Sequence, residues 1–202
     1  MAVLGGLLFY NGFGKRASLA DVLGRNLDAG VRDQVDRLTD AEFKVQDDAA
    51  LAAKVAVVCR AEPINLKLDD SVGGAEPKRV TVTDMFGDRV SVDGLDVTKA
   101  IPFEGDPNLF KLQPDQSDLN PPRGAVSGKK LVLGMEVRQS DAEAAVRHIE
   151  QTLSQVEKYI AWQAEAIAAY NAALPLAATP FIQRRRRALG AASDIARRLS
   201  GQ

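Results

Sequence analysis

The chain has 202 residues, a net charge of -1 and a hydrophobic fraction of 46%. These values fit one large or two small globular domains and exclude a chain that is disordered throughout. A charge so close to zero also excludes a protein that coats nucleic acid or an anionic membrane with its whole surface. The single cysteine, Cys59, excludes an intramolecular disulfide. We expect it to be a buried apolar residue in a reducing compartment.

The N-terminal stretch, residues 2–10, is apolar like the central part of a targeting signal, but it lacks the other features of one. It lacks a basic segment before it and is too short to span a membrane, which takes about 20 residues. We therefore expect a cytoplasmic protein with no membrane contact. Gly12, Gly14 and Lys15 follow, but Arg16 stands where a P-loop requires serine or threonine, so a flexible N-terminus is favoured over a nucleotide site.

Two helices are predicted between residues 18 and 60. The first begins near Ser18, whose hydroxyl can cap it, and has Asp21 in its first turn. Apolar residues then recur at helical spacing at Leu19, Leu23, Leu27, Val31, Val35 and Leu38. The second helix begins at residue 47 or 48 and runs to about Arg60, just before Pro63.

The pattern between residues 64 and 137 changes to short alternating runs that are typical of strands. Strands are predicted at residues 64–68, 80–82, 90–92, 97–103, 110–113 and 130–137. Glycine, proline, asparagine and aspartate separate them, so turns are expected at 73–74, 86–88, 93–94, 105–107, 120–122 and 127–128. This spacing predicts a small antiparallel sheet or sandwich.

The C-terminal third is predicted to be helical. Ser140 and Glu143 have the spacing of a capping box. Pro175 and Pro180 are expected to interrupt the helix, and we favour a helical hairpin over a single bent helix, with a further helix from about Phe181 to residue 199. The chain is therefore predicted to be α+β, with a helical segment at 1–62, a β-rich unit at 63–138 and a helical arm at 139–202.

No set of residues in the sequence forms a convincing catalytic or metal site. His148 is the one histidine, no Gly-x-Ser-x-Gly motif is present, and one histidine with one cysteine cannot fill a zinc site. Glu42 and Lys44 have the Glu-x-Lys spacing of metal-dependent nucleases, which we interpret as a chance match. The prediction is a protein without cofactor or metal that is not an enzyme, while a metal-dependent hydrolase stays a third alternative.

The basic cluster Arg184, Arg185, Arg186 and Arg187 is the one feature that points to a partner. Arginines in this number can neutralise phosphates of a nucleic acid or bind an acidic protein. They can also form ion pairs with glutamates of the preceding helix, such as those at positions 150, 157 and 165, or stabilise the helix C-terminus through the helix dipole. Few aromatic residues lie nearby to stack on bases, which argues against binding of single strands.

Several stretches resemble the N-terminal region of a group of uncharacterised bacterial proteins whose longer members continue into a restriction-endonuclease-like domain. The stretches are residues 100–110, 119–124, 131–133 and 149–187, with the motifs Tyr159-Ile160-Ala161-Trp162, Tyr170-Asn171-Ala172-Ala173-Leu174-Pro175 and Ile182-Gln183-Arg184-Arg185-Arg186. Because the sequence ends at Gln202, we expect the nuclease-like part of those longer members to be missing from this chain. The resemblance implies a recognition, regulatory or assembly module of a nuclease-type defence or nucleic-acid-associated system, with a nuclease subunit as one partner.

Two functional hypotheses follow. The first is this non-catalytic module, in which the four arginines contact nucleic acid or an acidic partner. The second is a scaffold that forms homo-oligomers without nucleic-acid contact. It would pair helices through an apolar stripe that contains Leu153, Val156, Ile160, Ile167, Tyr170 and Leu174.

Overall fold

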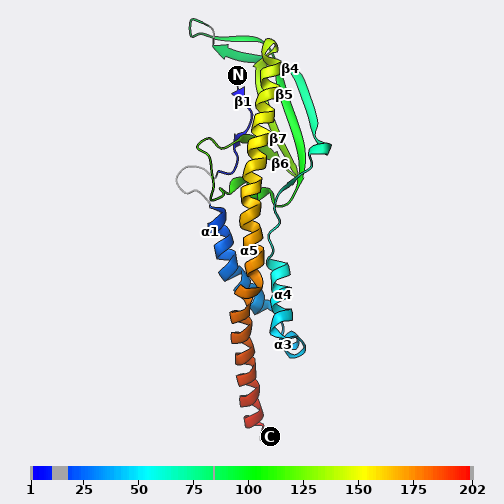
Figure 1. The fold of residues 1–202 in the computed structure, drawn as a ribbon, viewed down its shortest axis with the longest axis vertical. Coiled ribbons are helices and arrows are strands. Elements are labelled where there is room, and N and C mark those ends of the chain that lie inside the picture. The colour runs from blue at the N-terminus through cyan, green and yellow to red at the C-terminus, as the bar shows by residue number, and fades with distance from the viewer. Residues whose placement is uncertain (1, 11–17, 84, 201–202) are drawn as a thin grey trace. The chain divides into compact units, whose positions relative to one another are not determined.

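The computed structural model describes residues 2–10, 18–83 and 85–200, and the predicted glycine-rich stretch at positions 12–16 lies outside them. The α+β prediction is confirmed, with N-terminal helices, a seven-stranded antiparallel sheet among the described residues and a long C-terminal helix (Figure 1). Two compact units are present, and neither is continuous in sequence. The sheet unit joins the residues up to Leu19 to Glu62–Ala164, and the helical unit joins Ala20–Ala61 to the residues from Glu165 onward.

The strands of the sheet unit all pair antiparallel. They are β1 (Ala2–Val3), β2 (Gly6–Leu7), β3 (Asn65–Leu66), β4 (Val72–Thr83), β5 (Arg89–Glu104), β6 (Arg123–Ser127) and β7 (Lys130–Arg138). The order is β2-β6-β7-β5-β3, with β1 paired to β7 and β4 paired to β5. The predicted strand at 130–137 is confirmed as β7, and the predicted turn at 127–128 joins β6 to β7 through Gly128, whose φ is 58°.

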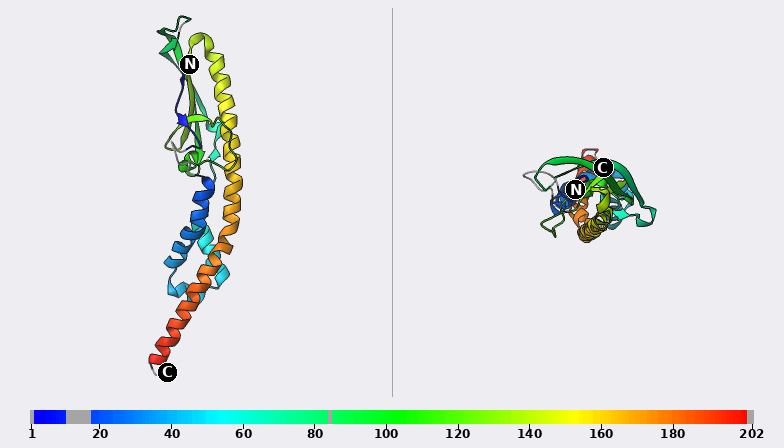
Figure 2. Two further views of the ribbon diagram at one scale, coloured as in Figure 1. Left: turned by 90° about the vertical axis from the view of Figure 1, so that its left-hand side faces the viewer. Right: turned by 90° about the horizontal axis from the view of Figure 1, so that it is seen from above.

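Strands β5 and β7 supply the apolar face of the sheet. Their register places Val97 opposite Met135 and Ile101 opposite Leu131. All four side chains are at least nine-tenths buried. This face lies toward the first part of the helix α5 (Ala142–Leu199), which runs along the sheet in Figure 1 and in the left view of Figure 2. The alternation of apolar residues that predicted the strands therefore also marks the core of the sheet unit.

The strands β4 and β5 are longer than predicted, and two of the predicted turns were wrong. Residues 73–74 lie inside β4, and residues 93–94 lie inside β5. Gly94 is needed there because a Cβ atom would collide with the Val137 carbonyl and the Val80 side chain. The predicted strand at 110–113 was also wrong. Pro107–Lys111 form a 3-10 helix, capped by the Asp106 carboxylate, which accepts a hydrogen bond from the Asn108 amide at 2.9 Å.

The helical unit contains the predicted N-terminal helices in a more divided form. They are α1 (Leu19–Arg25), α2 (Val31–Arg37), α3 (Asp40–Val45) and α4 (Asp48–Cys59), with a π-helical turn at Asn26–Gly30 between α1 and α2. The start predicted for the second helix is confirmed, since the Asp47 carboxylate accepts from the Ala50 amide at 2.7 Å. The short helix α3 was not predicted. Cys59 is half-buried rather than buried.

The predicted helical hairpin was wrong, because α5 is one helix and contains both Pro175 and Pro180. Both prolines are exposed, whereas Leu174, Ala178 and Ile182 in the same stretch of the helix are buried. The core therefore holds the helix together across the backbone hydrogen bonds that each proline removes. No helix among the described residues is both long enough and apolar enough to cross a membrane.

The predicted capping box at the start of α5 is also absent. Ser140 lies in a 3-10 turn, Gln139–Asp141, and its hydroxyl donates a hydrogen bond to the Asp141 carboxylate at 3.2 Å. This turn precedes the helix, which begins at Ala142. Serine spacing alone did not distinguish a cap from a turn that leads into the helix.

Candidate functional site

Arg186 is held inside the helical unit by three hydrogen bonds. Its guanidinium donates to the Asp48 carboxylate at 2.6 Å, to the Phe43 carbonyl at 2.5 Å and to the Gln46 carbonyl at 2.8 Å. The two carbonyls lie at the C-terminal end of α3, where a helix leaves its last carbonyls without intrahelical partners. Arg186 therefore closes the end of α3 and links it to the start of α4.

Arg185 makes equivalent contacts with α2. Its guanidinium donates to the Val35 carbonyl at 2.6 Å, in the last turn of that helix, and lies 3.6 Å from the Asp40 carboxylate. The guanidinium groups of Arg185 and Arg186 also lie over the ring of Phe43, at 5.2 and 5.4 Å from its centroid. Both arginines thus bind the C-terminal ends of helices, where a positive charge is favourable.

The other two arginines of the cluster point away from these contacts. Arg184 and Arg187 are exposed, and the ring of Phe181 lies 5.3 Å from the Arg184 guanidinium. The Arg187 side chain donates to the Gln183 carbonyl of its own helix at 3.4 Å and to no other acceptor among the described residues. Among the described residues, the ion partners of the cluster are Asp40 and Asp48, not the glutamates of α5. Partner contact by Arg184 and Arg187 stays a prediction.

The last part of α5 is exposed on every side from residue 190 to residue 199. An apolar stripe nevertheless continues along it at spacings of three, four and seven residues. This stripe begins with side chains that are fully buried in the helical unit and ends with exposed ones: Ala178, Ile182, Leu189, Ala192, Ala196 and Leu199. Helical geometry places Arg184, Arg187 and Arg198 on the opposite side. We call residues 187–199 the tail of α5.

Five of the six residues of the predicted helix-pairing stripe lie in the cores of the two units. Leu153 and Val156 are buried in the sheet unit, and Ile167, Tyr170 and Leu174 are buried in the helical unit. Ile160 is half-buried. The Tyr170 hydroxyl also donates to the Cys59 carbonyl at 2.9 Å, which fixes the end of α4. The apolar pattern that predicted helix pairing therefore corresponds to intramolecular packing.

Glu42 has a structural role in the helical unit. Its carboxylate accepts from the Thr39 amide at 2.6 Å, while the Thr39 hydroxyl accepts from the Glu42 amide at 3.4 Å, which completes a capping box for α3. Lys54 donates to the same carboxylate. These hydrogen bonds, first of all the one from Lys54, lower the pKa of Glu42 to about 2. Lys44 takes no part, and no group of three acids, histidines or cysteines that could hold a metal is found in the part of the chain that the structure describes.

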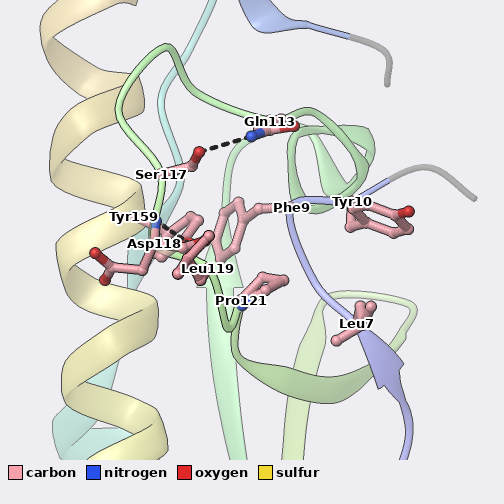
Figure 3. Close-up of a pocket in the computed structure, with 9 residues that line it drawn as sticks. All are labelled: Leu7, Phe9, Tyr10, Gln113, Ser117, Asp118, Leu119, Pro121 and Tyr159. Atoms are coloured by element: carbon pink, nitrogen blue, oxygen red, sulfur yellow. Dashed lines mark hydrogen bonds between the residues drawn. The ribbon is translucent and has the colours of Figure 1, made fainter. Parts of the chain in front are cut away.

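A cavity of about 300 Å³ in the sheet unit was not predicted from the sequence (Figure 3). Its walls include the rings of Phe9 and Tyr159, which stack with centroids 5.0 Å apart. The Tyr159 hydroxyl accepts from the Asp118 amide at 2.9 Å, and burial raises the pKa of this phenol. The carboxylate of the same residue, Asp118, forms an ion pair with Lys158 at 3.2 Å. The described residues that line this cavity place no base beside a nucleophile.

No family model, no curated protein and no solved structure matches this chain.

Proposed function

We propose that the protein is a non-catalytic assembly module that binds a partner protein through the tail of α5. The observation that carries this proposal is the apolar stripe that leaves the core of the helical unit after Ile182, passes the half-buried Leu189 and is exposed from Ala192 to Leu199. Leu199 is 84% exposed, and Ile195 beside the stripe is 57% exposed. A stripe of this kind is stabilised when another apolar surface packs on it.

The charges of the tail indicate which kind of partner would bind it. Arg187 and Arg198 have no ion pair among the described residues, and Asp194, the one acid of the tail, pairs with Arg197 at 3.3 Å. A second copy of the tail would bring the same excess of positive charge, which disfavours self-association. A partner helix with an apolar stripe and acidic flanks fits the tail better. The sequence resemblance makes a nuclease subunit the first partner to test.

Nucleic acid fits this arrangement less well. Two of the four clustered arginines, Arg185 and Arg186, are engaged with backbone carbonyls and carboxylates of the same unit. Phosphate contact would then depend on the remaining exposed arginines, with no aromatic side chain on the tail to stack on bases. The apolar stripe would also stay exposed in such a complex.

A photo-crosslinking amino acid placed at Ile195 in the native host tests the proposal, with the same group at the exposed Gln155 of the sheet unit as the control. We expect one cross-linked protein at position 195, its loss when Arg187 and Arg198 are replaced by glutamate, and none at position 155. A cross-link only to a second copy, or no cross-link, would contradict the proposal. So would salt-dependent binding of duplex DNA that is lost in the variant with alanine at positions 184, 187, 197 and 198.

A further inference from the structure

An apolar groove of about 520 Å³ runs along one edge of the sheet unit, between β4 and α5. Two strands form one side of it and the helix forms the other. The residues that matter for the argument are Gly73, Ala75, Val97, Lys99, Val146 and Ile149. Val146 is 43% exposed, whereas Ile149 is buried. The groove therefore has a buried apolar floor and an accessible wall on the helix.

The groove lies beside an open strand edge. Among the described residues β4 pairs only with β5, so the backbone groups on its outer side have no strand partner (Figure 1). Such an edge binds another extended chain through main-chain hydrogen bonds. Pro77 lacks an N–H group and is followed by Lys78 and Arg79, features that block strand addition. Pairing is therefore restricted to Val72–Glu76, which is roughly 17 Å of strand.

The composition of this strand segment determines what can fill the groove. Gly73 and Gly74 have no side chains, and a Cβ atom added at Gly73 would meet nothing within 4 Å. A second copy of β4 would bring the same glycines and leave the groove empty. An incoming strand with large apolar side chains at alternate positions would fill it, since alternate residues of a strand point to the same face.

Two charged residues at the groove determine where the incoming strand can carry an acidic group. Lys99 lies opposite Gly73 in the sheet register and has no ion pair among the described residues. Glu150 lines the groove from the helix. An acidic group of the incoming strand is therefore attracted at the end near Gly73 and repelled at the helix side.

We propose that this groove is a second docking site, which binds an extended segment of a partner protein as an added strand on Val72–Glu76. The bound segment carries large apolar residues at two alternate positions and a carboxylate that meets Lys99. This site belongs to the sheet unit and does not depend on the tail of α5.

Random heptapeptides displayed on phage and selected on the full chain provide the probe. We expect selected peptides to share large apolar residues two positions apart and an acidic residue, and one such synthetic peptide to slow hydrogen exchange of the outward-facing amides within residues 72–76. Val146→Arg, which fills the groove, and Lys99→Glu should each weaken binding about tenfold or more, whereas Leu119→Arg, a matched change at a 99% exposed site, should not.

Three outcomes of the peptide experiment would overturn the proposal, and a fourth would come from light scattering. The first three are the absence of selected peptides, selected peptides whose affinity does not change in Val146→Arg, and binding without protection of the β4 amides. A dimer in light scattering that Val146→Arg dissociates would instead assign the groove to a second copy of the chain. Circular dichroism of each variant separates loss of binding from loss of folding.

Discussion

The sheet unit and the helical unit both attach α5 through side chains that bind backbone carbonyls, but they use groups of different charge. In the sheet unit, Gln163 donates to the carbonyls of Leu109 and Leu112 at 2.9 and 2.7 Å and is 1% exposed. In the helical unit, Arg185 and Arg186 do the same while their side chains remain 24% and 36% exposed. A neutral amide can be buried completely at modest cost, whereas a guanidinium is accommodated where water still reaches it.

Gln163→Leu should have the largest effect of the single changes considered. It removes both hydrogen bonds to the Leu109 and Leu112 carbonyls while filling the space, and we expect the sheet unit to lose about 2 kcal/mol of unfolding free energy. Urea unfolding followed by the fluorescence of Trp162, the single tryptophan, reports on this unit. Gln155→Leu, on the exposed side of the same helix, should change the midpoint little. Equal losses in both variants would show that the buried amide has no special role.

Pro175→Ala and Pro180→Ala should each raise the stability of the helical unit by about 1 kcal/mol, because each restores a backbone hydrogen bond at an exposed position of a continuous helix. Hydrogen exchange at residues 171–182 and urea unfolding give the measurement. If α5 instead divided at these prolines, the substitutions would lower stability, since proline would then be the better residue for the break.

Glu42 should make the stability of the helical unit depend on pH, in the acidic range alone, and we expect this to be the smallest effect. The pKa of its carboxyl falls from 4.5 to about 2 in the folded chain, mainly through the hydrogen bond from Lys54. The stabilisation is therefore present above pH 4.5 and is lost as the pH falls toward 2. Glu42→Gln should flatten the stability of the helical unit over this range, whereas Glu165→Gln, at an exposed site, should leave the profile unchanged. A profile that Glu42→Gln does not alter would exclude this role.

The sequence predicted the elements whose signals are local. Alternation located β7 and the core of β5, and an aspartate cap located α4. It failed where distant packing overrides local preference. Gly94 predicted a turn, but it lies where two strands approach closely. Pro175 and Pro180 predicted breaks, but both are exposed on a continuous helix whose other side is packed in the core. Their roles depend on neighbours that local patterns do not identify.

The candidate site was predicted in outline only. The four consecutive arginines are evident in the sequence. Which two of them contact α2 and α3 (the inner pair, Arg185 and Arg186) and which two are exposed (the outer pair, Arg184 and Arg187) depends on the rotation of α5 relative to α2 and α3. The short helix α3 was itself unpredicted, so the carbonyls that Arg186 binds could not be foreseen. The groove beside β4 was missed because Gly73 and Gly74 were interpreted as a turn.

The division of the four arginines is tested most directly by two double variants compared in urea unfolding, with hydrogen exchange of α2, α3 and α4 as the local readout. Replacing Arg185 and Arg186 by alanine should cost the helical unit about 3 kcal/mol and speed exchange at the ends of α2 and α3, because their carbonyls lose charged donors. Replacing Arg184 and Arg187 by alanine should change stability by less than about 0.5 kcal/mol. Equal losses in the two variants, or a larger loss for the outer pair, would contradict this division.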